Sequence, residues 1–147
     1  MNLKEELYNQ CDAFVNKRLQ NVEDVISSNQ NALQSETKNS AGDKHETGRA
    51  MLQLEMEKAS QQLAGINQMK EILAKIDISK FSKIAHLGSV IETNSANYFL
   101  SISAGKISAF NIDYFAISVS SPIGKLLLGK QEREKITFNN NVNPLCI

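Results

Sequence analysis

The first half of the chain carries apolar residues at the spacing of a helix that is buried along one narrow stripe. Steps of three and four residues are typical of a coiled-coil seam. The stripe predicts a helix from Leu3 to about Gln34, and Asn29 occupies its one polar position. Its apolar members are Leu3, Leu7, Cys11, Phe14, Val15, Leu19, Val22, Ile26 and Leu33.

A second stripe of the same kind begins at Leu52, and Lys70 is its polar position. Its apolar members are Leu52, Met56, Ala59, Leu63, Ile66, Leu73 and Ile76. No proline precedes Pro122, so nothing breaks either helix. The short polar link favours an antiparallel hairpin within one monomer, an arm roughly 50 Å long at about 1.5 Å per residue. The alternative is a helical bundle completed by dimerisation.

After Asp77 the pattern changes to short runs rich in Ile, Val, Phe and Tyr. Strands are predicted at 84–93, 97–103, 113–120 and 134–138, with turns at NSAN, AGK, FNID and NNNVNP and a short last strand at LCI. Between them, SSPIGKLLLGK predicts a short helix that Ser120 or Ser121 caps, with Pro122 in its first turn and Gly129 at its end.

These patterns together predict an α+β protein in two parts. A coiled-coil hairpin covers residues 1–77, with its tip near 36–47, and a small antiparallel sheet domain with one short helix covers 78–147. The first part holds 9 Lys+Arg and 12 Asp+Glu, a net charge of −3, and the second holds 7 and 4, a net of +3. An acidic arm and a basic sheet domain could orient the protein on a partner through their field.

Composition adds two expectations about where the protein works. The chain has 147 residues, and no apolar run approaches the about 20 residues that a membrane helix needs. The N-terminal segment lacks a signal-peptide pattern, so we expect the protein in the cytoplasm. Cys11 and Cys146 lack metal-binding spacing and are expected to be free thiols, with Cys11 a packing residue.

The stretch SAGDKHETGRA, residues 40–50, places two acids three residues apart, Asp43 and Glu46. One interpretation is a helix N-terminus that Asp43 caps, with Glu46 at the positive end of the helix dipole. The other is a pair of oxygen ligands for Mg²⁺, which usually takes only one or two carboxylates from a protein. The two interpretations are compatible, because a capped helix start would fix the direction of both carboxylates.

Several segments together resemble the bacterial Gre-type transcript-cleavage factors, a family of transcription elongation factors. AISVSSPIGKLLLGKQEREKITF (116–138) is similar to their C-terminal domain, and HLGSVIET (86–93) is similar to its first sheet strand. GDKHE (42–46) resembles the Gly-Asp-x-x-Glu motif at the tip of their hairpin. The order of the parts matches across nearly the whole chain.

The resemblance implies an FKBP-like sheet domain that docks on RNA polymerase and a hairpin that enters its secondary channel. It further implies that Asp43 and Glu46 help to hold a second Mg²⁺, shared with the polymerase active centre, which then cleaves backtracked RNA. The protein would then be an accessory factor and no enzyme by itself. The residues that would face the polymerase are Ser121, Pro122, Lys125 and Lys130.

The chain also departs from the family pattern at the tip. Thr47-Gly48-Arg49-Ala50 stands where the family has Asn-Ala-(Asp/Glu)-Tyr, and Lys44 replaces an apolar residue. Lys44 and Arg49 put positive charge where it could compete with a cation. These differences favour an alternative function, a regulator that binds the secondary channel without cleavage activity.

Overall fold

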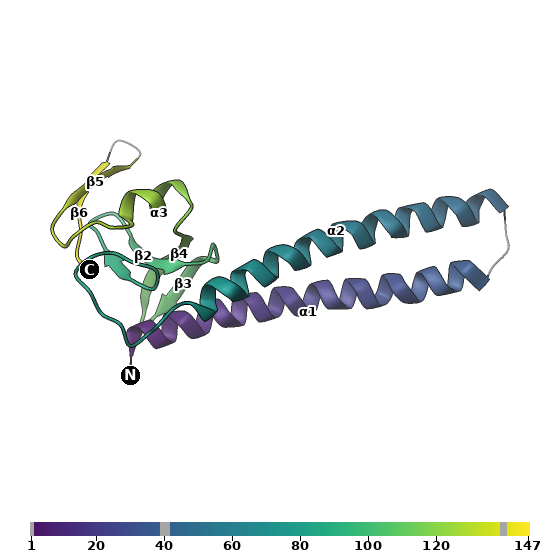
Figure 1. Cartoon of the computed structure of the whole chain (residues 1–147), viewed down its shortest axis with the longest axis horizontal. Coiled ribbons are helices and arrows are strands. Elements are labelled where there is room, and N and C mark those ends of the chain that lie inside the picture. Colours follow the sequence, from purple (N-terminus) through teal and green to yellow (C-terminus); the bar gives the residue numbers. More distant parts are fainter. Residues whose placement is uncertain (1, 39–41, 139–140) are drawn as a thin grey trace. The chain divides into compact units, whose positions relative to one another are not determined.

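A computed structural model describes residues 2–38, 42–138 and 141–147, with side chains described for 2–35, 48–137 and 144–147. The helices are α1 (Leu3–Lys38), α2 (Gly42–Ala74) and α3 (Pro122–Leu127) (Figure 1). The strands are β1 (Val90–Glu92), β2 (Asn97–Ser101), β3 (Gly105–Ala109), β4 (Ile112–Ser118), β5 (Lys135–Phe138) and β6 (Asn141–Pro144). The predicted α+β class is therefore confirmed.

The chain divides into two compact units. The arm unit is Val15–Met69, and the head unit combines Met1–Phe14 with Lys70–Ile147. Helices α1 and α2 each contribute to both units, because the boundaries of the arm unit fall inside them.

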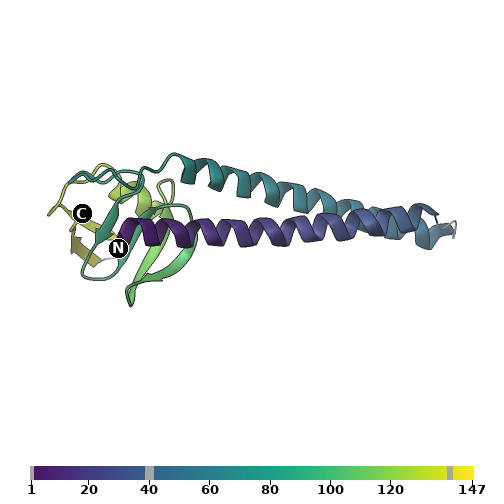
Figure 2. The same cartoon turned by 90° about the horizontal axis from the view of Figure 1, so that it is seen from below.

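In the arm unit α1 and α2 run side by side in opposite directions (Figures 1 and 2). The buried residues recur every seven positions: Val15, Val22 and Asn29 on α1, and Ala59 and Ile66 on α2. The intervening seam positions, such as Leu19 and Leu63, are half-buried. The predicted hairpin with one narrow seam per helix is thus confirmed.

The head unit contains a four-stranded sheet with the order β1-β2-β4-β3. β1 pairs antiparallel with β2, and β3 with β4, but β2 and β4 run parallel. The sheet is therefore mixed, whereas an antiparallel one was expected. The reason is β3, a strand between two expected turns. Because β3 reverses the chain once more, β4 returns in the same direction as β2.

The sheet is covered on both faces within the head unit. The first turns of α1 cover one face, where Cys11 Sγ lies 3.5 Å from Ser101 Oγ and both residues are buried. Helix α3 and the β5–β6 hairpin lie on the other face (Figure 1). The core of that face consists of Ala85, Ile91, Leu100, Ile123, Leu127, Ile136 and Leu145.

Two further expectations about strands are corrected. The strand expected at 84–93 is regular only from Val90 to Glu92, because Gly88 adopts φ +97° and interrupts the ladder just before it. The prediction of a turn at NNNVNP was wrong in part, since Asn141–Pro144 forms β6 and pairs with β5. The expected last strand is reduced to one bridge between Cys146 and Glu92.

Both cysteines are free thiols, and Cys11 is buried as a packing residue, as expected. In the part of the chain that the structure describes, neither long helix has the length of uncharged apolar sequence that crossing a bilayer would require.

Candidate functional site

The start of α3 is fixed by a small network of serine hydroxyls. Ser121 is the N-cap, and its Oγ accepts the Gly124 N–H at 3.1 Å. The same hydroxyl donates to the Ser118 carbonyl at 2.6 Å. Pro122 follows in the first turn, where its missing N–H is not needed. The predicted cap and proline position are confirmed.

Gly124 is required by a close approach inside this network. A Cβ atom at this position would lie 2.0 Å from the Ser118 carbonyl oxygen. That oxygen belongs to the backbone of β4 and already accepts the Ser121 hydroxyl, so it cannot move away easily. The Ser-Pro-Ile-Gly stretch is therefore a steric unit in which helix α3 packs directly onto the end of β4.

The end of α3 is tied to the segment that precedes β1. The Leu128 N–H donates to the Gly124 carbonyl at 2.9 Å, and Gly129 adopts φ +82°, the conformation that usually ends a helix. The Gly129 N–H then donates to the Ala85 carbonyl at 2.8 Å, and the Ala85 N–H donates to the Lys130 carbonyl at 2.8 Å. Both ends of α3 are thus anchored to the head unit.

Helix α3 buries one side and exposes the other. Ile123 and Leu127 belong to the core, whereas Leu126 is 37% exposed and Leu128 is 45% exposed. Pro122 and Lys125 are exposed as well, and positions 122, 125 and 126 share one helix face. We call Pro122, Lys125, Leu126 and Leu128 the α3 surface. Neighbouring exposed apolar side chains are a feature of protein-binding surfaces.

The residues predicted to bind a partner therefore differ in accessibility. Pro122 and Lys125 are exposed and belong to the α3 surface. Ser121 is half-buried, and its hydroxyl is already used in the cap. Lys130 is also half-buried, and its backbone joins the anchor at Ala85.

Asp43 and Glu46 are the second and fifth residues of α2, which begins at Gly42, so Asp43 lies inside the helix and is not its N-cap. Their side chains, like those of Lys44, His45 and Thr47, lie outside the described residues. Positions three apart in a helix share a face, so a helical start at Gly42 is compatible with joint use of the two acids. Elsewhere, among the side chains that are described, no three His, Cys, Asp or Glu residues gather as a metal site would require.

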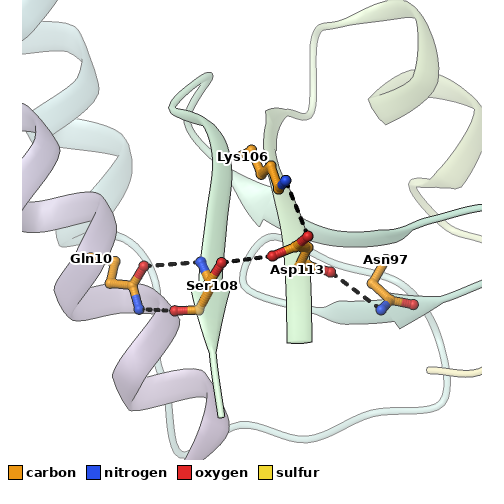
Figure 3. A network of polar contacts seen from close by, with 5 residues as sticks. All are labelled: Gln10, Asn97, Lys106, Ser108 and Asp113. Carbon is orange, nitrogen blue, oxygen red and sulfur yellow. Dashed lines mark hydrogen bonds and ion pairs between the residues drawn. The ribbon is translucent and has the colours of Figure 1, made fainter. Parts of the chain in front are cut away.

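A polar network that sequence reasoning missed joins α1 to strand β3 (Figure 3). The Gln10 side-chain amide donates to the Ser108 carbonyl and accepts the Ser108 N–H at 3.2 Å, so it pairs with the strand as another strand would. The Ser108 hydroxyl donates to Asp113 Oδ1 at 2.7 Å, and Lys106 Nζ lies 3.2 Å from Asp113 Oδ2. The Ser108 hydrogen bond, followed by Lys106, lowers the pKa of Asp113.

No signal in the sequence could have identified Gln10 in this role. It is one of several polar residues between seam positions of α1, and its function depends on where β3 lies in the folded protein. Comparisons of the chain with protein-family models, with curated proteins and with solved structures found no match. A functional argument for this protein therefore depends on its own residues and their geometry.

Proposed function

We propose that this protein is a Gre-like transcription factor that acts as a monomer on bacterial RNA polymerase. The observation that carries the proposal is a combination within one chain. A heptad-paired hairpin has Asp43 and Glu46 near the start of its second helix, and a sheet unit presents a short helix, capped by Ser121, with exposed leucines. This combination supports the proposal, because the Gre resemblance implies acids at the hairpin tip and a docking element in the sheet domain.

In this proposal the hairpin enters the secondary channel, and the two tip acids act at the polymerase active centre. Carboxylates suit Mg²⁺, which prefers oxygen ligands and takes few of them from any one protein. A second metal ion would stabilise the attacking and leaving oxygens when backtracked RNA is cleaved. Asp43 and Glu46 would contribute ligands, while the polymerase supplies the reaction itself.

The α3 surface would contact the polymerase. Leu126 and Leu128 supply apolar area that is otherwise exposed to water, and Lys125 supplies a charge for an acidic neighbour. The anchored ends of α3 keep this surface rigid, which lowers the entropy lost on binding.

The cleavage step is tested with backtracked elongation complexes of the cognate polymerase, with RNA length read on a gel. We expect Mg²⁺-dependent shortening of the transcript that disappears in Asp43→Asn and in Glu46→Gln. Glu55→Gln and Glu57→Gln are matched controls, because both are exposed acids on the same helix and should retain cleavage. Cleavage that persists in both variants would contradict a role of Asp43 and Glu46 in the reaction.

The alternative is a channel-binding regulator without cleavage, which the positive charges of Lys44 and Arg49 favour. In that case wild-type protein changes initiation or elongation in the same reactions but leaves transcript ends intact. Replacing both cations, Lys44→Ala with Arg49→Ala, would then show whether they prevent cleavage, because a gain of shortened RNA would identify them as the cause.

Docking is tested separately by measuring affinity for the polymerase. We expect Leu128→Ser to weaken binding about tenfold or more, since a few side chains that become buried carry most of the binding energy of an interface. Ile112→Ser is the matched control, because Ile112 is 46% exposed at the start of β4 and does not belong to the α3 surface. Equal losses for both variants would argue against docking through the α3 surface.

A further inference from the structure

Each edge of the four-stranded sheet is paired at one residue. At the β3 edge the Gln10 side chain occupies the backbone groups of Ser108. At the β1 edge the chain near its C-terminus pairs at a single point. There the Glu92 N–H donates to the Cys146 carbonyl at 2.7 Å, and the Cys146 N–H donates to the Glu92 carbonyl at 2.9 Å.

Val90 continues this edge with free backbone groups. In an antiparallel ladder, successive residues direct their N–H and C=O groups to opposite sides. Ser89 and Thr93 bond toward β2, and Glu92 bonds away from it to Cys146. Val90 therefore points to the same side as Glu92, where neither its N–H nor its C=O has a partner among the described residues. An unpaired N–H and C=O on an edge strand can pair with another strand.

A cavity of about 590 Å³ lies along this edge, inside the head unit. Its size falls in the range of ligand pockets. Leu3, Phe81, Val90 and Ile147 supply apolar walls, and Phe81 is 70% exposed. Lys4 and Lys83 bring two positive charges to the lining, and Glu92 brings one negative charge.

Lys4 is the unusual member of this lining. The residue is only 7% exposed, and its Nζ donates to the Lys80 carbonyl at 2.6 Å while lying 4.3 Å from the centre of the Phe81 ring. Burial lowers the pKa of Lys4, and the charge of Asp77 partly offsets this. An ammonium group has three donors, so a carboxylate that entered the cavity would be a favourable partner for Lys4.

We propose that this edge binds an extended peptide segment of a partner protein. The peptide adds a strand beside β1 at Val90, places an apolar side chain in the cavity and directs a carboxylate toward Lys4. The free N–H and C=O of Val90 can bind a peptide backbone, and alternate side chains of the peptide supply specificity. This inference is independent of the proposed role in transcription, which uses the arm tip and the α3 surface.

The probe is a library of random eight-residue peptides displayed on phage and selected on the full-length chain. The best peptide is synthesised with a fluorescent label, and its affinity is measured by anisotropy. We expect Phe81→Ala to weaken binding about tenfold, because an exposed aromatic wall is a typical binding anchor. Phe110→Ala is the matched control, since Phe110 is 49% exposed and does not line the cavity.

A second experiment tests the backbone contact without altering the protein. N-methylation of the peptide at successive positions should abolish binding at the position that bonds to Val90 and spare its neighbours. In ¹⁵N-labelled protein the Val90 amide should shift on binding and exchange more slowly with solvent. Peptides ending in an acid or an amide distinguish a terminal carboxylate from an acidic side chain, and Lys4→Met should weaken whichever form binds better.

Several results would overturn the proposal. These are failure of the library to yield a binder, an unmoved Val90 amide, indifference to N-methylation, or equal losses for Phe81→Ala and Phe110→Ala. Light scattering could give one further result against the proposal. Self-association that Phe81→Ala abolishes and the peptide cannot displace would assign the edge to a second copy of this chain instead.

Discussion

The arm unit and the head unit bury their residues in opposite ways. In the arm, burial recurs every seventh residue on each helix, and one of these positions is the polar Asn29. In the head, fully buried residues such as Leu7, Ile91, Leu100 and Leu127 come from segments far apart in the chain. An arm of this kind depends on a repeated period, whereas the head depends on particular contacts between distant segments. The two units should therefore differ in how they tolerate substitution.

The largest expected difference comes from matched leucine truncations. Leu100→Ala removes a side chain with no exposed surface from the head core, and we expect it to cost about 3 kcal/mol of unfolding free energy. Leu19→Ala removes a half-buried side chain from the arm and should cost about 1 kcal/mol. Both changes in free energy can be measured by denaturant unfolding, with amide exchange as the probe of each unit. Equal costs for the two variants would contradict the expected difference between the units.

The next difference concerns two helical glycines. Gly124→Ala in α3 forces a Cβ against the Ser118 carbonyl and should cost about 2 kcal/mol through overpacking. Gly65→Ala in α2 meets no atom within 4 Å and should instead stabilise the arm by up to about 1 kcal/mol, because alanine is the better helix former. The melting temperatures should shift in opposite directions, and a stable Gly124→Ala protein would contradict the steric argument.

A smaller effect is expected at the polar position of the seam. Asn29 is buried, and its Nδ2 has no partner within the described residues, so Asn29→Leu should stabilise the arm by about 1 kcal/mol. A buried Asn in a coiled coil can also fix register and oligomeric state. We therefore expect the variant to form some dimers in analytical ultracentrifugation. Asn31→Leu, at an exposed position, should produce neither change.

The smallest effect is a pH dependence confined to the head. The pKa of Asp113 is lower in the folded state than its usual value of about 3.9. Ionised Asp113 therefore adds stability above that value, and this contribution is lost as the pH falls through the folded-state pKa. The side chain is exposed, so the effect is slight. Asp113→Asn should flatten the acid limb of head unfolding, whereas Asp24→Asn in the arm should leave it unchanged.

The sequence predicted the arm well because its determinants are local and periodic. It also predicted the Ser121 cap, Pro122 in the first turn of α3 and the stop at Gly129, each of which has a short-range physical cause. It missed β3 and β6. Glycine, asparagine and proline around those strands indicate turns, and only pairing with β4 and β5 makes them regular.

The candidate sites show the same division. Pro122 and Lys125, which the resemblance implies as partner-binding residues, are exposed on α3. Gln10 and Val90 were missed because their importance comes from the sheet edges beside them, which no local pattern reveals. Lys130 is half-buried, and its carbonyl accepts the N–H of Ala85, a residue 45 positions away in the chain.

The interruption of the head by the arm has a consequence for how such a protein can vary. In the sequence, residues of the head unit both precede the arm unit, up to Phe14, and follow it, from Lys70 onward. Because burial repeats every seven residues, removing one heptad from each helix would leave every remaining seam position in place. Each such deletion would shorten the arm by about 10 Å at helix rise. Insertions and deletions of whole heptads could therefore set the length of the arm in fixed steps. The residues that form the sheet would not have to change.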